Sequence, residues 1–260
     1  VFNTAVALGR LGAPAAWFGG LSRDLFGAQL AAALEASGVD YTLAARSDRP
    51  TTLAFVTLTN GQASYAFYDE NTAGRLLALP DVPVLGDDTR ALFFGGISLV
   101  AEPAAETFAA LCRHAGDRAV MLDPNIRPAF VSDDRAYRQR LAAMLGHAHV
   151  VKVSDEDLAW LRLSSEDLLG LGPSLVLVTR GAQGVEAVTD RGRLALPAPA
   201  VAVVDTVGAG DTFNAGLLAG LHRDDLLSTD ALRHAPLTML EPAIALGIAA
   251  AAVTVGRAGA

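Results

Sequence analysis

One segment late in the chain, Asp205-Thr-Val-Gly-Ala-Gly-Asp211, combines residue types that suit the transfer of a charged group. It follows an apolar run and opens a helix-like stretch, so Gly208, Ala209 and Gly210 are expected to present unpaired backbone N–H groups to an anion. Asp211 stands where a carboxylate can take the proton of a hydroxyl nucleophile. The combination predicts phosphoryl transfer to an alcohol. A bare Gly-x-Gly-Asp also fits a tight turn before an acidic first helical turn, so this prediction needs support from the rest of the chain.

The elements that must position this segment alternate between strand-like and helix-like runs, which predicts a parallel sheet covered by helices and hence an α/β fold. Strands are expected over residues 15–18, 92–94, 119–122, 150–153, 175–179, 185–188, 193–196 and 201–204. Helices are expected over residues 3–11, 24–37, 103–114, 134–145, 208–221 and 242–253, with another from about 155.

Two β-type runs depart from this alternation, residues 53–59 and 62–68. They are joined by Asn60-Gly61, a strong short-range hairpin signal. Antiparallel strands inserted in a βα chain indicate a small flap, or lid, at the edge of the main sheet.

Three further polar clusters follow predicted strands, over residues 123–127, 152–157 and 179–181. In an open α/β sheet, ligands bind beyond the carboxyl ends of the strands. Together with the Asp211 segment, these clusters predict one shared cleft.

The composition limits the partners and the location of the protein. A net charge of −8 and a pI near 5.0 argue against a nucleic-acid or anionic-membrane surface. Cys112 is the only cysteine, which excludes a disulfide framework and indicates a reducing, cytoplasmic compartment. The longest apolar stretch, residues 242–255, is too short to span a bilayer, so no membrane attachment is expected.

The 260 residues suit a single domain, residues 1–260, with a lid contributed by about 50–70. Residues 1–8 already have the pattern of a helix start, and Asn3 is a candidate helix cap. We therefore expect that an opening strand of the domain is missing from this sequence.

Two common nucleotide-binding patterns are not present. A P-loop needs Gly-x4-Gly-Lys-Ser/Thr, and the sole lysine, Lys152, lies in no such string. A dinucleotide-binding fold carries Gly-x-Gly-x-x-Gly after its first strand, whereas Gly208-Ala-Gly210 comes late and continues Asp-Thr-Phe.

The longer string Asp205-Thr-Val-Gly-Ala-Gly-Asp-Thr-Phe213 closely resembles the signature of the ribokinase-like (PfkB) carbohydrate kinases, and the resemblance covers nearly the whole chain. It implies a three-layer α/β/α fold with a mostly parallel central sheet and a small β-hairpin lid. It also implies ATP and Mg²⁺ as cofactors, with K⁺ in some relatives, and Asp211 as the catalytic base beside an anion hole at Gly208 to Gly210.

The resemblance also implies residues that contact the sugar. Asn3 matches a sugar-contacting asparagine, and Asn125 and Arg127 match an Asp-x-Asn-x-Arg strand end, where a guanidinium can neutralise moving charge. A surface turn with a solvated arginine is the alternative interpretation of Arg127, and the shared cleft favours the functional one. Tyr68 belongs to a lid segment, residues 67–75, that looks like bacterial fructokinases.

The nucleotide side is implied in the same way, through residues Lys152, Thr179, Gly181, Gly184, Ala249 and Ala252. Asp157 stands for the glutamate of an Asn-x-x-Glu element, and Ser154 for its asparagine, so Asp157 is expected to serve Mg²⁺ through water. An N-capped acidic first turn explains the same residues equally well. Asp205 and Val207 match backbone positions that hold a monovalent cation in some relatives.

Fructose is the preferred substrate, phosphorylated at its 6-hydroxyl. A 2-keto-3-deoxygluconate kinase is the alternative, with Arg75 and Tyr68 holding the carboxylate. A catalytically silent sugar or nucleotide sensor is the alternative of another class, and the intact Asp211 argues against it. A homodimer formed through the lid is expected.

Overall fold

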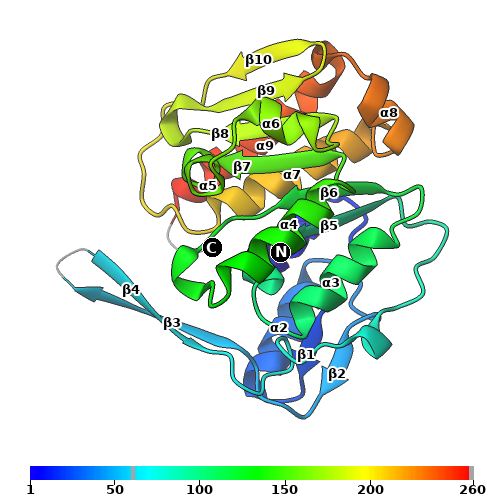
Figure 1. Cartoon of the computed structure of the whole chain (residues 1–260). Coiled ribbons are helices and arrows are strands. Elements are labelled where there is room, and N and C mark those ends of the chain that lie inside the picture. Colours follow the sequence, from blue (N-terminus) through cyan, green and yellow to red (C-terminus); the bar gives the residue numbers. More distant parts are fainter. Residues whose placement is uncertain (60–61, 258–260) are drawn as a thin grey trace.

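The computed structural model describes residues 1–59 and 62–257. Its centre is a six-stranded sheet in the order β10-β9-β8-β7-β6-β5 (Figure 1). Four strands run parallel, namely β5 (Ala91–Gly95), β6 (Ala119–Asp123), β7 (Val150–Ser154) and β8 (Leu175–Thr179). Two antiparallel strands close one edge, β9 (Val185–Thr189) and β10 (Gly192–Leu196). The expected mostly parallel α/β sheet is confirmed.

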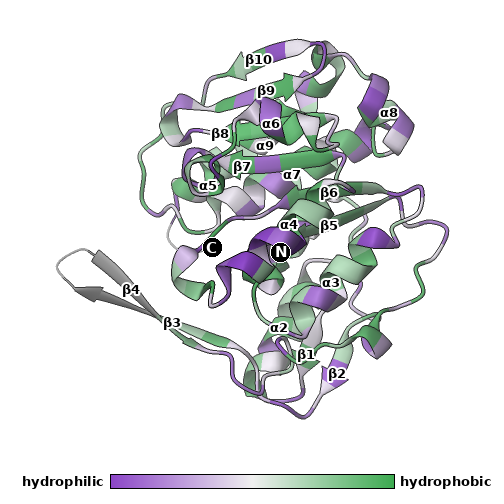
Figure 2. Cartoon of the chain, in the orientation of Figure 1, coloured by the Kyte–Doolittle hydropathy of each residue, from purple (hydrophilic) through white to green (hydrophobic). Residues whose placement is uncertain are grey.

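Alternate residues of the parallel strands enter two separate cores, which makes the fold three-layered. Val151 and Val153 pack on one face with α3 (Ala104–Arg113), α4 (Asp134–Leu145), α5 (Asp155–Leu161) and α6 (Ser165–Gly170). Val150 packs on the other face with α7 (Ala209–Arg223), α8 (Thr229–His234) and α9 (Leu237–Val255). The central strands are accordingly rich in apolar residues (Figure 2), as expected for parallel strands buried on both faces, although β7 carries the charged Lys152 at its middle.

A smaller amino-terminal part lies beside the β5 edge of this sheet (Figure 1). It consists of α1 (Phe2–Arg10), β1 (Gly20–Ser22), α2 (Leu25–Ala36) and β2 (Ala45–Ser47), with β1 and β2 paired in parallel. A cavity of about 620 Å³ separates β5 from residues 13–18 and is lined mainly by apolar side chains. Helix α1 also contacts α7, which brings the start of the chain to the Asp211 segment.

Three local predictions are wrong. Asn3 is not a cap, because α1 begins at Phe2 and Asn3 lies inside its first turn. Residues 15–18 form no strand and contribute only a single bridge from Ala16 to Asp40. Residues 201–204 also form no strand, and Val203 and Val204 are 67% and 61% exposed. Residues 15–18 and 201–204 have the apolar pattern of a strand, but no neighbouring strand extends the pairing. Asn3 has the side chain of a cap, but Val1 takes the cap position.

The lid is a two-stranded ribbon that projects from the body of the molecule (Figure 1). Strand β3 (Leu53–Thr59) pairs antiparallel with β4 (Gln62–Tyr68), in the register that aligns Leu53 with Tyr68. The strands match the prediction, and the predicted turn at Asn60-Gly61 lies outside the described residues. An isolated two-stranded ribbon is only marginally stable, so its root needs outside support.

Asp24 supplies much of that support at the lid root. It caps α2 by accepting from the Gly27 amide at 2.7 Å, and it accepts from the backbone N and Oγ1 of Thr51 at 2.7 and 2.6 Å. These hydrogen bonds, led by the one from the Thr51 hydroxyl, lower the pKa of Asp24 to about 2. A second hydrogen bond joins the two ends of the ribbon, because the hydroxyl of Thr52, just before β3, donates to Asp69, just after β4, at 2.8 Å. One carboxylate therefore joins the start of α2 to the start of the lid.

Helix α9 is longer than predicted, since it begins at Leu237 rather than Pro242. Within the described part of the chain it is the one helix whose length and apolar composition would allow it to cross a membrane, and 28% of its apolar window is buried. It packs closely along α7, where a Cβ on Gly216 would lie 2.7 Å from the Gly247 Cα. The contact with α7 gives α9 the place of a core helix.

Candidate functional site

Asp211 lies in the first turn of α7, at the carboxyl edge of the parallel strands. The helix begins after Gly208, whose φ of +81° is the left-handed conformation that favours glycine. The first N–H groups of α7 and its positive dipole end are therefore presented at Gly208 to Gly210, as the sequence predicts. This arrangement suits an anion that approaches the same end of the helix as Asp211.

Helix α1 holds the Asp211 carboxylate. Its Oδ1 accepts from the Thr4 hydroxyl at 2.8 Å and from the Val1 amine at 3.1 Å. Burial raises the pKa of Asp211, whereas the hydrogen bond from Thr4 and the charge of Lys152 lower it. Both hydrogen bonds go to Oδ1, which leaves Oδ2 as the oxygen for an incoming hydroxyl as far as the described residues show.

A buried charged cluster lies directly behind this helix start. The Lys152 Nζ is 3.2 and 3.4 Å from the two Asp123 oxygens, and Asn214 Nδ2 donates to Asp123 Oδ2 at 2.7 Å. Asp123 and Lys152 follow the paired residues Leu122 and Val151, so the register of β6 and β7 places them side by side. The sequence pointed to Lys152, but not to its partners.

The Asp157 carboxylate is committed to local structure. Its Oδ1 accepts from the Ile126 amide at 2.7 Å, and its Oδ2 accepts from the backbone N and Oγ of Ser154 at 2.8 and 2.9 Å. Asp157 is 3% exposed, and Ser154 in turn accepts from its amide, which completes a capping box on α5. The structure thus supports the capping interpretation, and the bonds to Ile126 and Ser154 leave Asp157 suited at most to a water-mediated metal contact.

Asn125 and Arg127 occupy the turn after β6. Asn125 adopts a left-handed φ of 41°, and the exposed Arg127 donates to its neighbour's carbonyl, that of Ile126, at 3.1 Å. The Arg127 guanidinium is free of carboxylate partners among the residues that the structure describes.

The predicted nucleotide side lies along β7, β8 and the adjoining turn. Thr179 donates to the Val153 carbonyl at 3.2 Å, across from β7. Gly184 has a φ of +99°, and a Cβ there would lie 2.0 Å from the Leu196 carbonyl oxygen, so only glycine fits. Gly181 starts the same turn with a φ of +52°.

The remaining predicted residues on this side lie on or beside α9. Ala249 and Ala252 are partly or fully exposed on that helix. The Val207 amide donates to Asp205 Oδ1 at 2.9 Å, in the loop before α7. Over residues 1–59 and 62–257, no group of three or more histidine, cysteine or acidic side chains is arranged to hold a metal ion.

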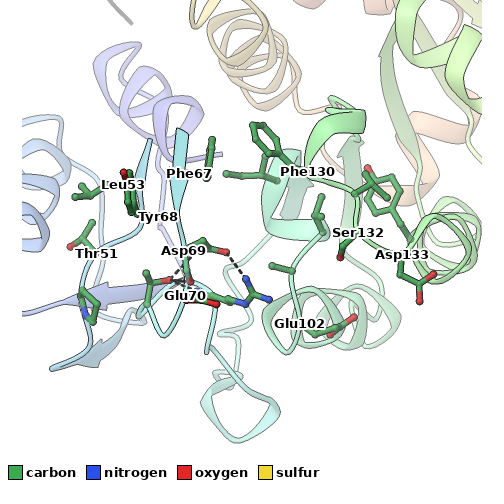
Figure 3. A pocket seen from close by; sticks show the side chains of 18 of the residues that line it. Thr51, Leu53, Phe67, Tyr68, Asp69, Glu70, Glu102, Phe130, Ser132 and Asp133 are labelled. Atoms are coloured by element: carbon green, nitrogen blue, oxygen red, sulfur yellow. Dashed lines mark hydrogen bonds and ion pairs between the residues drawn. The ribbon is translucent and has the colours of Figure 1, made fainter. Parts of the chain in front are cut away.

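A cavity of about 1010 Å³ separates the lid from the turn after Arg127 and from α4 (Figure 3). Phe67 of the lid contacts Phe130 across it, with ring centroids 4.5 Å apart, and Tyr68 lines the lid side. Polar groups line its floor, including Asp69 paired with Arg75 at 3.7 Å. Asp211 is not part of this lining, which contains one predicted site residue, Tyr68.

Comparison with known proteins identifies the family. The pfkB family carbohydrate kinase profile matches residues 2–260. The chain belongs to this family of kinases. A fructokinase from Rhizobium leguminosarum bv. trifolii is 49% identical over 235 residues, which cover 88% of this kinase and 72% of that protein.

Solved structures of similar proteins agree with the fold. Fructokinase with bound ATP from Xylella fastidiosa superposes with a TM-score of 0.89 at 28% identity, over 100% of this kinase and 84% of that chain. Fructokinase from Vibrio cholerae O395, with fructose, ADP and calcium ion bound, superposes with a TM-score of 0.83 at 26% identity, over 99% of this kinase and 84% of that chain. These relatives confirm the ribokinase-like α/β fold.

The structure therefore brings together only part of the predicted site of this kinase. Asp211, Gly210 and Lys152 meet at the start of α7, and Tyr68 lies across the lid cavity. Asn3 is exposed in the first turn of α1, one residue before the Thr4 that holds Asp211. Thr4, Asp123 and Asn214 are contacts that sequence reasoning missed. A signal was available only for Asp123, which begins the Asp-x-Asn-x-Arg string.

Proposed function

We propose that this kinase is an ATP-dependent fructokinase that forms fructose 6-phosphate. The observation that carries the proposal is the 49% identity to a fructokinase over most of the chain, combined with an intact Asp211 at the start of α7. The cavity beside Phe67 and Tyr68 of the lid has both apolar and polar side chains, which suits a small neutral sugar, because aromatic faces cover its C–H groups while polar side chains meet its hydroxyls.

The proposed chemistry follows from the position of Asp211. Asp211 accepts the proton of the sugar hydroxyl, while Thr4 fixes the orientation of the carboxylate through Oδ1. The Gly208 to Gly210 amides stabilise the charge of the transferring phosphoryl group. Asn3, Asn125 and Arg127 are proposed to reach the sugar once the lid closes over it and excludes water.

ATP is the proposed phosphoryl donor, and Mg²⁺ would neutralise its phosphate charge when bound. We assign the nucleotide to the side of Thr179, Gly181 and Gly184, with Ala249 and Ala252 beside the base. Asp157 is proposed to act on Mg²⁺ only through water, given its three internal hydrogen bonds. A monovalent cation, K⁺ in the first instance, is proposed at the loop of Asp205 and Val207. Because the reaction consumes ATP, we also propose a cytoplasmic location.

One contact bears on the alternative substrate. A 2-keto-3-deoxygluconate kinase needs a cation for the substrate carboxylate, and Arg75 was the candidate. In the structure the Arg75 guanidinium pairs with Asp69 at 3.7 Å. A carboxylate substrate would have to compete with Asp69, whereas a neutral sugar would not, and this favours fructose.

A sugar panel tests the proposal. With fructose, ketodeoxygluconate, ribose, adenosine and fructose phosphates as acceptors, ADP release is expected to be highest with fructose and to depend on Mg²⁺. Phosphorus NMR of the product should show the ester at the 6-position. Higher kcat/KM with ketodeoxygluconate would replace fructose as substrate. No acceptor-dependent ADP release with retained nucleotide binding would make the chain a sensor instead.

We further propose a homodimer formed through the lid, because the ribbon leaves Phe55 and Tyr68 53% and 62% exposed, with ring centroids 5.6 Å apart. Light scattering should give twice the chain mass of 26.9 kDa. Phe55→Asp should shift the mass to that of one chain, whereas Val84→Asp, at an equally apolar position that is 94% exposed, should not. A monomeric parent protein would contradict the proposal.

A further inference from the structure

Lys152 is the only lysine of the chain, and it is held inside the fold. Its side chain is 7% exposed and that of Asp123 is 6% exposed. Removing an ammonium group from water is costly unless it is paired, and the pairing here is loose, with both oxygens beyond 3.1 Å. An ammonium carries three donors, so its contact with Asp123 does not use all of its capacity.

The position of the ammonium is the unusual feature. A Cβ on Gly210 would lie 3.4 Å from the Lys152 Nζ, so the positive charge lies against the Gly-Ala-Gly segment. This is the end of α7 where the helix dipole is already positive. The Lys152 ammonium and the positive end of the α7 dipole repel each other when no ligand is bound. A bound anion at this point makes the arrangement favourable.

Asn214, in the second turn of α7, holds this arrangement from the helix side. It is 1% exposed, and its amide donates to Asp123 Oδ2 at 2.7 Å. Strand β6, strand β7 and helix α7 are thus tied to one another through Asp123. If Lys152 served only as a partner for Asp123, the charge pair would not need to lie beneath the anion-binding turn.

We propose that Lys152 is a positioning residue for phosphoryl transfer: held by Asp123 and Asn214 behind Gly210, it places a positive charge against the start of α7 and makes that helix start attractive to phosphate without leaving the core. This inference rests on the proposed kinase function. It differs from the direct nucleotide contact that the sequence implied for Lys152, because the ammonium acts from behind the turn.

The charged groups near Asp211 are few, so the effect of Lys152 on the titration of Asp211 can be measured separately. Among the described side chains, Lys152 on β7 supplies the charge that acts on the Asp211 carboxylate, with Asp123 on β6 behind the lysine. Helix α9 carries Glu241 two residues before Ala243, which packs on Gly220 and therefore lies far along α7. Arg10 ends α1, at the opposite end from Thr4. Loss of the Lys152 charge should therefore move the titration of Asp211 toward higher pH.

Two variants test the proposal. Lys152→Met removes the charge but leaves Asp123 buried and unpaired, which destabilises the fold. Lys152→Met with Asp123→Asn removes both buried charges. In the folded double variant, we expect kcat to fall about tenfold or more with little change in the KM for fructose. Arg90→Met, at an exposed ion pair with Asp225, is the control that should leave kcat unchanged.

A readout independent of turnover separates this inference from the proposed function. The ¹³C signal of the Asp211 carboxyl, assigned by its loss in Asp211→Asn, gives the titration midpoint of the parent and of the double variant. A midpoint at higher pH in the double variant supports the proposal even if the parent turns over no sugar. A double variant with the parent's midpoint and the parent's kcat overturns it and leaves Lys152 a structural partner of Asp123.

Discussion

Replacing Asp211 with asparagine is expected to lower kcat by about 10²–10⁴-fold, the usual contribution of a general base. The amide keeps the size of the side chain, and its oxygen can still accept from Thr4, now at 2.8 Å from Oδ1. It cannot take a proton from the sugar. Nucleotide affinity should change little, because the Gly208 to Gly210 amides remain in place. Steady-state kinetics and calorimetric titration with ADP measure the two quantities separately.

The matched control for this variant is Asp230→Asn. Asp230 also lies in the first turn of a helix, α8, and its side chain is 89% exposed. Both substitutions remove one negative charge near a helix start, so a general dipole effect would appear in both. Turnover by Asp211→Asn within threefold of the parent enzyme would show that Asp211 merely complements the dipole.

The pH dependence should agree with this assignment. The hydrogen bond from Thr4 and the charge of Lys152 lower the folded pKa of Asp211, so the base is ionised throughout the neutral range. Its contribution is lost only as the pH falls through that lowered pKa. An acid limb of the kcat profile near neutral pH would therefore belong to another group.

How far the sequence predicted the fold depended on whether the signal was local. Strands 53–59, 62–68 and 175–179 and helix 134–145 were predicted with the bounds that the structure has, because alternation and apolar runs are contained within the segments. The run at 201–204 is equally rich in valine, but no strand pairs with it, and the Val204 amide bonds to Val255 of α9 instead. Strand propensity expresses fit to a neighbouring surface, which a single segment does not contain.

The candidate site shows the same division. The string around Asp211 identified the helix start and the base, because a helix N-terminus is a local feature. The contact between Lys152 and Asp123 depends on the register of β6 and β7, and that with Asn214 depends on how α7 packs on the sheet. Thr4 reaches Asp211 across 207 positions of the chain. None of these contacts follows from spacing along the sequence.

Gly216 gives the second large effect, on stability. It lies in α7, where a Cβ would come within 2.7 Å of the Gly247 Cα and of the Leu246 carbonyl oxygen. Helix propensity alone predicts that Gly216→Ala stabilises the protein by about 1 kcal/mol. The clash is with backbone that cannot rotate away, so α7 and α9 must separate, and overpacking of this kind costs about 1–3 kcal/mol and occasionally more. We expect the clash to win and the free energy of unfolding to fall.

Gly170→Ala is the matched control, because Gly170 is also helical, at the end of α6, and a Cβ there meets nothing within 4 Å. There the entropy of the unfolded chain should dominate, and the variant should be as stable as the parent or more so. Thermal unfolding should show Gly216→Ala melting several degrees lower, at about 2–4 °C per kcal/mol for a domain of this size, and Gly170→Ala unchanged or higher. If both variants gained stability, propensity would outweigh packing at Gly216. The close contact of α7 with α9 would then not be what fixes the helix that carries Asp211.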